Sequence, residues 1–158
     1  MQSMLAPLVI VVFGLGLSMV NWQVGQQAPG AGTAGSMEAK AAAAAQQAEV
    51  FGAACMAAAT GAPGLISSNV AVALPAGVGS PSGAACMTTS AGAGRNVYAY
   101  MTAVPGAAGQ ILQDSQGDAL WFRVQSAGVA ANLMTGRTAA VPASIPVGSL
   151  LTWVQTSN

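Results

Sequence analysis

The stretch MEAKAAAAAQQAEVFGAACMAAAT, residues 37–60, decides the fold that we expect for this chain. Its alanine-rich middle has very high helix propensity, and Gly61 and Pro63 follow it as helix-ending residues. Ser36 stands where a side-chain cap would start the helix, and Glu38 suits the first turn because that end of the helix dipole is positive. The sequence therefore predicts a helix of roughly 24 residues, about 36 Å long.

After Gly61 the sequence changes character, because short β-prone runs alternate there with turn-rich segments. We expect strands at 70–74, 96–102, 119–125 and 149–155, and a short helix within 105–116. Phe51 and Cys55 stand four residues apart, on one face of the long helix, and should hold it against these strands. The predicted fold class is α+β, with a long Ala-rich helix packed on a small, mainly antiparallel sheet.

An uncharged apolar segment, Met4–Val20, opens the chain. With the two residues that follow, its length approaches that of a bilayer span, and Trp22 would lie at the membrane interface. We favour an uncleaved signal anchor over a cleaved signal peptide or a buried core helix. The reason is that the start of the chain has no Lys or Arg and no clear small-residue cleavage site. The residues expected to anchor the chain in lipid are Met4, Leu8, Ile10, Phe13, Leu17 and Trp22.

The predicted domain organisation has three parts: a membrane anchor at 1–22, a Gly/Ala/Gln-rich linker at 23–36 and a periplasmic α+β domain at 37–158. A prepilin leader is cut after a Gly and usually carries a Glu five residues beyond the cut. After Gly14 that position is Met19. After Gly16 it is Asn21. This mismatch argues against processing as an ordinary pilin.

The charge content of the chain excludes several classes of function. Charged residues make up 5% of the sequence, against about 25% in an average soluble domain. The net charge is zero and no basic run is present, so we expect no nucleic acid as a partner. Histidine is absent, which excludes Ser-His-Asp and Cys-His catalysis and histidine-based zinc sites within the chain. We expect neither a metal nor another cofactor.

Both cysteines lie in copies of the pentapeptide GAACM, at 52–56 and 83–87. The first copy falls in the predicted helix and the second in a Gly/Ser/Pro-rich loop, so we interpret the match as a coincidence of an alanine-rich composition. Cys55 and Cys86 would tend to pair in an oxidising periplasm, where such a bridge would contribute about 3–4 kcal/mol. The alternative is two small buried thiols in the same core.

Two further groups of residues are candidates for binding. Asp114 and Asp118 lack the spacing and the closing Glu of a calcium loop, and a solvated turn is the simpler interpretation. Trp121 and Arg123 alternate along one predicted strand and would share a face, which could contact a partner or contribute to core packing. Tyr98 and Tyr100 alternate likewise. The predicted partner-contact face therefore consists of Tyr98, Tyr100, Trp121 and Arg123.

The order of these parts resembles that of the PilM family of type IVb thin-pilus systems, which are often encoded with conjugative plasmids. The stretches that carry the resemblance are AQQAEVFGAACMAAATGAPG (45–64), LPAGVG (74–79), RNVYAYMTAVPGAAGQIL (95–112) and PASIPVGSLLTWV (142–154). The closest of them are 95–112 and 142–154. The family consists of small inner-membrane proteins proposed to belong to the pilin transport apparatus or the pilus basal body. It has no established catalytic residues, and none is carried over.

The resemblance implies a single-pass inner-membrane protein with a periplasmic C-terminal domain, acting in type IVb pilus assembly or pilin transport without catalysis. Its expected partners are other pilus assembly proteins, pilin subunits, membrane lipid and, in a homo-oligomer, further copies of itself. The alternative is a pilin-like or minor pilin subunit that enters an extracellular filament. A third class is a periplasmic glycoside hydrolase that uses Asp114 and Asp118 as paired carboxylates.

Overall fold

The computed structural model describes residues 32–116 and 118–157. Internal contacts divide the chain into two units, Met1–Ala39 and Lys40–Asn158. Of the first unit, residues 32–39 are described, and they include the start of the long helix α2 (Thr33–Gly61). The predicted membrane anchor, residues 1–22, lies outside the described residues, as does most of the predicted linker. In the part of the chain that the structure describes, no helix is both long enough and apolar enough to cross a membrane.

Helix α2 begins four residues before the predicted Met37 and ends one residue after the predicted Thr60. Ser36 is therefore not its cap; it lies within the first turn, and its hydroxyl donates to the carbonyl of Thr33 at 2.8 Å. Helix propagation explains the difference, since each residue added to an existing helix gains a hydrogen bond without a new nucleation cost. The four residues Thr33–Ser36, placed in the linker from composition, join the helix for this reason.

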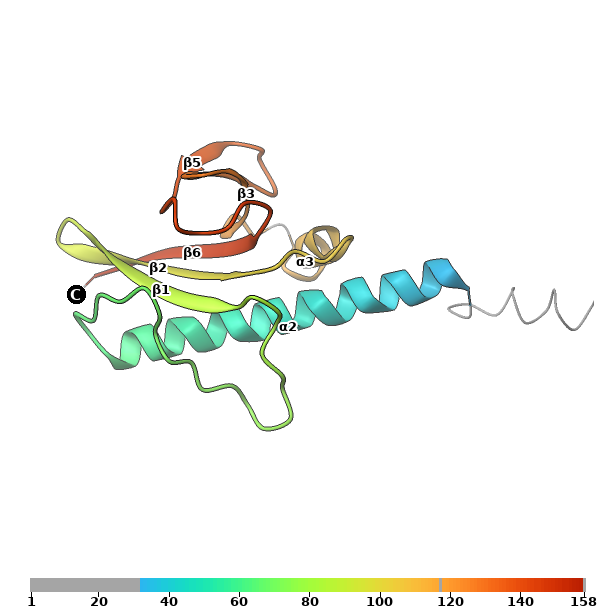
Figure 1. Ribbon diagram of the computed structural model, residues 1–158, viewed down its shortest axis with the longest axis horizontal. Helices are drawn as coiled ribbons and strands as arrows, with labels where there is room; N and C mark the ends of the chain where they lie inside the picture. The colour runs from blue at the N-terminus through green and yellow to red at the C-terminus, as the bar shows by residue number, and fades with distance from the viewer. Residues whose placement is uncertain (1–31, 117, 158) are drawn as a thin grey trace, which may run out of the picture. The chain divides into compact units, whose positions relative to one another are not determined.

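The second unit contains a six-stranded sheet in the order β1-β2-β6-β3-β4-β5, in which every neighbouring pair is antiparallel. The strands are β1 (Ala85–Ala91), β2 (Gly94–Met101), β3 (Trp121–Ser126), β4 (Val129–Asn132), β5 (Thr138–Ala140) and β6 (Leu150–Ser157). The short helix α3 (Ala107–Asp114) lies between β2 and β3 in the chain, within the predicted range. The α+β class is confirmed, and β2, β3 and β6 match three predicted strands (Figure 1).

Two expectations about the strands are wrong. Residues 70–74 form no strand; Val70 turns into the core instead, and its backbone N–H donates to the carbonyl of Cys86 at 2.7 Å. Cys86, expected in a loop, lies in the edge strand β1. The preceding segment covers the outer edge of β1, through Val70 at Cys86 and through the Ser67–Thr88 bridge. Covering an edge strand in this way satisfies backbone groups that would otherwise be open for pairing.

A stripe of small side chains lets α2 lie close to the sheet. We call it the small-residue seam; its members, buried and spaced alternately four and three residues apart, are Ala41, Ala45, Ala48, Gly52, Cys55 and Ala59. This spacing places them on one side of the helix. The contact leaves little room at Gly52, where a Cβ atom would lie 3.0 Å from the methyl carbon of Thr152. Larger residues along the seam would push the helix away from the sheet.

Apolar residues cover both faces of the sheet. Towards α2, the seam packs against alternate residues of β2, namely Val97, Ala99 and Met101, together with Trp121 and Leu150. The intervening residue Tyr98 belongs to a second cluster, which includes Val124, Ala130, Ile145 and Leu151. Alternation along the strands places these two clusters on opposite faces. In Figure 1 the helix accordingly runs beside β1, β2 and β6, and β3 and β5 lie farther from it.

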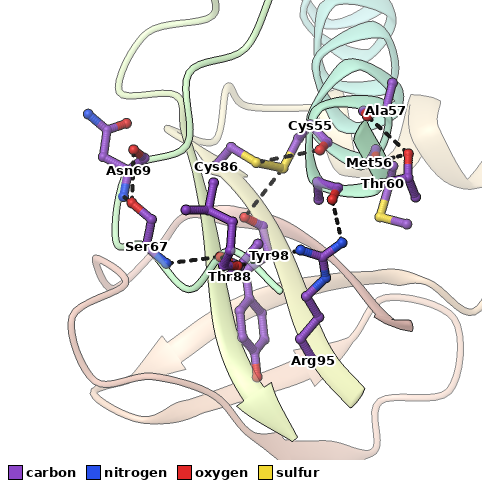
Figure 2. Close-up of a disulfide and its surroundings, with 12 residues drawn as sticks. Cys55, Met56, Ala57, Thr60, Ser67, Asn69, Cys86, Thr88, Arg95 and Tyr98 are labelled. Atoms are coloured by element: carbon purple, nitrogen blue, oxygen red, sulfur yellow. Dashed lines mark hydrogen bonds between the residues drawn. A yellow bond between two sulfur atoms is a disulfide. The ribbon is translucent and has the colours of Figure 1, made fainter. Parts of the chain in front are cut away.

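The C-terminal end of α2 receives a buried arginine from β2. Arg95 is 2% exposed, and its guanidinium donates to the carbonyls of Ala59 and Ala62, the latter at 2.6 Å. It also reaches the carbonyl of Leu65 and the hydroxyl of Thr156. Figure 2 shows this side chain pointing at the helix end, near the Cys55–Cys86 bridge. Carbonyl groups at a helix C-terminus carry partial negative charge, so they stabilise a buried cation without a carboxylate.

Replacing Arg95 with Met should lower the free energy of unfolding by about 2–4 kcal/mol, because the helix carbonyls would lose buried, charge-assisted donors. Urea unfolding followed by circular dichroism measures the change. The matched control is Arg123→Met, at an exposed arginine, which should stay within about 0.5 kcal/mol of the original chain. Equal effects of the two substitutions would contradict the role given to Arg95.

Candidate functional site

The largest concentration of charge on the domain surrounds one open hollow of about 410 Å³. Helix α2, the segment around the end of α3, and strands β3 and β6 form its walls. We call it the acidic hollow; its lining residues are Glu49, Gly52, Ala53, Met56, Asp114, Ser115, Asp118, Leu120, Trp121, Thr152 and Val154. Three of the four acidic residues of the whole sequence therefore lie at this one place.

The local sequence explains why two of the carboxylates lie here. Asp114 is the last residue of α3, and the hydroxyl of Ser115 donates back to the carbonyl of Ile111 at the helix end. The oxygen of Asp118 accepts the backbone N–H of Leu120 at 3.1 Å, which forms a local side-chain turn. The interpretation of this segment as a turn thus matches the structure, and the turn holds both aspartates at the rim of the hollow.

The third carboxylate, Glu49, comes from α2, far away in sequence. Partial burial raises its pKa above the ordinary value of 4.5, and the negative charge of Asp114 raises it further. No ion pair neutralises these groups among residues 32–116 and 118–157. The hollow therefore presents concentrated negative charge in a chain that has few charges in total.

The floor of the hollow is apolar. Trp121 is 5% exposed, and its ring lies within 4 Å of the position that a Cβ atom would take on Gly52. Met56, Leu120 and Val154 add further apolar surface. Such a floor can take the aliphatic part of a long basic side chain whose cation reaches the carboxylates at the rim.

Sequence reasoning singled out Asp114 and Asp118 but missed Glu49. The structure brings the three residues to one hollow because α3 packs beside α2, a tertiary contact that sequence spacing does not reveal. The only local sign is that Glu49 follows Ala48, a member of the small-residue seam, and therefore lies beside the buried face of α2.

The predicted partner-contact face is not a single surface. Trp121 is buried beneath α2, whereas Tyr98 is buried on the opposite face of the sheet with 3% exposure. Tyr100 is half-buried next to Tyr98, and Arg123 is exposed. Core packing, the competing interpretation, describes both Tyr98 and Trp121, because their side chains belong to the clusters on opposite faces of the sheet.

An aromatic cluster on the far face of the sheet was not anticipated. Trp153 lies 5.8 Å from Tyr98 and 5.8 Å from Phe122, measured between ring centroids. Its indole N–H donates to the side chain of Asn96 at 3.1 Å. Burial raises the pKa of Tyr98, although hydrogen bonds with Thr89 and Asn96 oppose that shift. The cluster packs on the sheet face opposite α2, where Tyr98 is buried and Phe122 and Trp153 are half-buried.

Cys55 and Cys86 form a disulfide that joins α2 to β1 (Figure 2). The sulfur atoms are 2.02 Å apart, and both residues are buried. The two GAACM copies lie in unlike surroundings: the first is helical, and the second runs from a turn into a strand. This difference agrees with a chance repeat. With both thiols bonded, neither cysteine can act as a nucleophile in this state.

The described residues contain no group of three or more His, Cys, Asp or Glu side chains arranged to hold a metal ion. Comparisons of the chain with protein families, with curated proteins and with solved structures found no match. The class that the structure itself defines is a disulfide-linked α+β domain.

Replacing Glu49 with Gln should stabilise the protein at neutral pH by roughly 0.5 kcal/mol or less. A carboxyl whose pKa is raised on folding is most favourable when protonated, so the original chain loses stability as pH rises through that pKa. The gain in stability from the substitution should therefore shrink as the pH is lowered and vanish below about 4.5.

Thermal unfolding across this pH range measures the gain in stability. The control is Glu38→Gln, in the exposed first turns of α2. A gain that grows towards acid pH would contradict the assignment.

Proposed function

We propose that this chain is a non-catalytic, membrane-anchored component of a type IVb pilus assembly or pilin transport apparatus, acting through protein–protein contacts. In this proposal, residues 1–22 hold the chain in the bacterial inner membrane as a single span. The α+β domain lies in the periplasm, where it meets other assembly proteins or pilin subunits.

The disulfide is the main observation that supports a location of the α+β domain outside the cytoplasm. Structural disulfides form and persist in oxidising compartments such as the bacterial periplasm and are rare in the cytoplasm. Cys55 and Cys86 are buried between the helix and the sheet, which gives their bond a structural role. Together with the uncharged segment 4–20, this bond supports an exported domain attached to a membrane.

The resemblance to the PilM family supplies the assignment to a pilus system. The two stretches that carry it most closely, 95–112 and 142–154, contain most of β2, much of α3 and the greater part of β6. Strands β2 and β6 pair over their whole length as neighbouring interior strands of the sheet. The resemblance thus concerns interior strands of the sheet, which supports a similar domain rather than a shared surface loop.

The second candidate is a pilin-like or minor pilin subunit that leaves the membrane and enters a filament. Several large apolar side chains are exposed on the part of the chain that the structure describes, namely Met37, Leu65, Ile66, Val104, Leu120, Met134 and Val147. Where such groups lie together as a patch, they would favour burial between subunits. In a filament, the apolar segment 4–20 would pack against other subunits instead of lipid.

Membrane fractionation of the native host, followed by protease treatment of spheroplasts, tests the proposal. We expect an integral inner-membrane protein that is digested from outside the spheroplast and whose cysteines resist alkylation until a reductant is added. Recovery of the chain in sheared filaments would support the pilin-like candidate. A cytoplasmic chain with freely alkylated cysteines would contradict both candidates.

A further inference from the structure

One exposed apolar side chain lines the acidic hollow, and a second lies on a neighbouring turn. Leu120, 42% exposed, lies on its rim, and Met134, 59% exposed, lies on the turn between β4 and β5. The amide nitrogen of Asn132 joins the two segments, donating to the carbonyl of Ala119 at 2.6 Å. The backbone N–H of Leu133 donates to the carbonyl of Trp121 at 2.9 Å. The turn therefore lies beside the segment that carries the rim residue Leu120, and hollow, rim and turn are treated together as one surface.

The turn is held rigidly by the same asparagine. The side-chain oxygen of Asn132 accepts the backbone N–H groups of Met134 and Thr135, at 3.1 and 2.9 Å, and the hydroxyl of Thr135 at 3.0 Å. Asn132 is itself buried. A turn fixed in this way loses little conformational freedom when it binds, which favours a contact made by its exposed side chains.

The same turn carries a positive charge. Arg137 is exposed, and its backbone N–H donates to the hydroxyl of Thr135. No residue of the described part forms an ion pair with it. The surface thus combines apolar groups, an unpaired cation on the turn and unpaired carboxylates in the hollow.

We propose that this surface is a two-fold interface between copies of the chain. The β4–β5 turn of each copy contacts the hollow of the other, placing Arg137 near Glu49 and Asp114 and packing Met134 near Leu120. A two-fold contact requires a surface that complements itself, with each charge facing its opposite across the axis. An apolar centre with charges around it is the usual composition of such interfaces.

A second copy of the chain suits this surface because each copy carries both the carboxylates of the hollow and the cation of the β4–β5 turn. All the acidic residues of the second unit lie in the hollow, whereas Arg137 lies outside it on the turn. The buried cation Arg95 does not compete for these carboxylates, because it is bound to the end of α2. This self-association is independent of the pilus assignment, and its failure would leave the proposed function unchanged.

Charge reversal in the full-length chain, purified in detergent, tests the interface by sedimentation equilibrium. The original chain should dimerise more weakly as salt increases. Arg137→Glu and Asp114→Arg should each weaken the dimer by about tenfold or more, because every two-fold contact loses both charge pairs and gains repulsion. The matched control is Arg123→Glu, an equal charge change outside this surface, which should leave the dimer intact.

Mixing the R137E and D114R chains gives the decisive result. In a mixed dimer, one of the two symmetry-related contacts brings the two substituted side chains together with opposite charges, and the other keeps the original Arg137–Asp114 pair. The mixture should therefore associate more tightly than either variant alone, which damage to folding would not produce. The proposal is overturned if the original chain stays monomeric, if mixing restores nothing, or if Arg123→Glu weakens the dimer as much as Arg137→Glu.

Discussion

The close approach of α2 to the sheet is the contact on which the rest of the domain depends. Alanine and glycine bury little surface singly, so a core built from them is stable only when the backbones lie close enough for continuous van der Waals contact. The small-residue seam suits this condition, and a side chain at Gly52 would meet the methyl group of Thr152. The same approach places Trp121 beneath the helix and makes it the floor of the acidic hollow.

Two specific bonds supplement this packing near the C-terminal half of α2. The Cys55–Cys86 disulfide ties the helix to β1, and Arg95 binds its last carbonyl groups from β2. Both bonds fix the position of the helix along the sheet. The small-residue seam alone would specify that position only weakly. The carboxylate of Glu49, about one turn before Gly52, is held beside Asp114 at the end of α3 as a consequence.

Sequence reasoning identified the parts of the fold that have strong local signals. The alanine run indicated the helix, and β2, β3 and β6 contain bulky β-prone residues, among them Tyr98, Phe122 and Trp153. The strands β4 and β5 are short and rich in alanine, so they form through pairing with their neighbours rather than from local preference. Glu49 was missed for a related reason, because its place in the hollow depends on how α3 packs beside α2.

The most direct test of this account compares leucine substitutions on two sides of α2. Ala48 lies in the small-residue seam, whereas Ala43 is exposed. Ala48→Leu should lower the free energy of unfolding by about 1–3 kcal/mol, since the added side chain forces the helix away from the sheet. Ala43→Leu should change it by less than about 0.5 kcal/mol. Similar small effects at both positions would contradict a fold that depends on close helix–sheet contact.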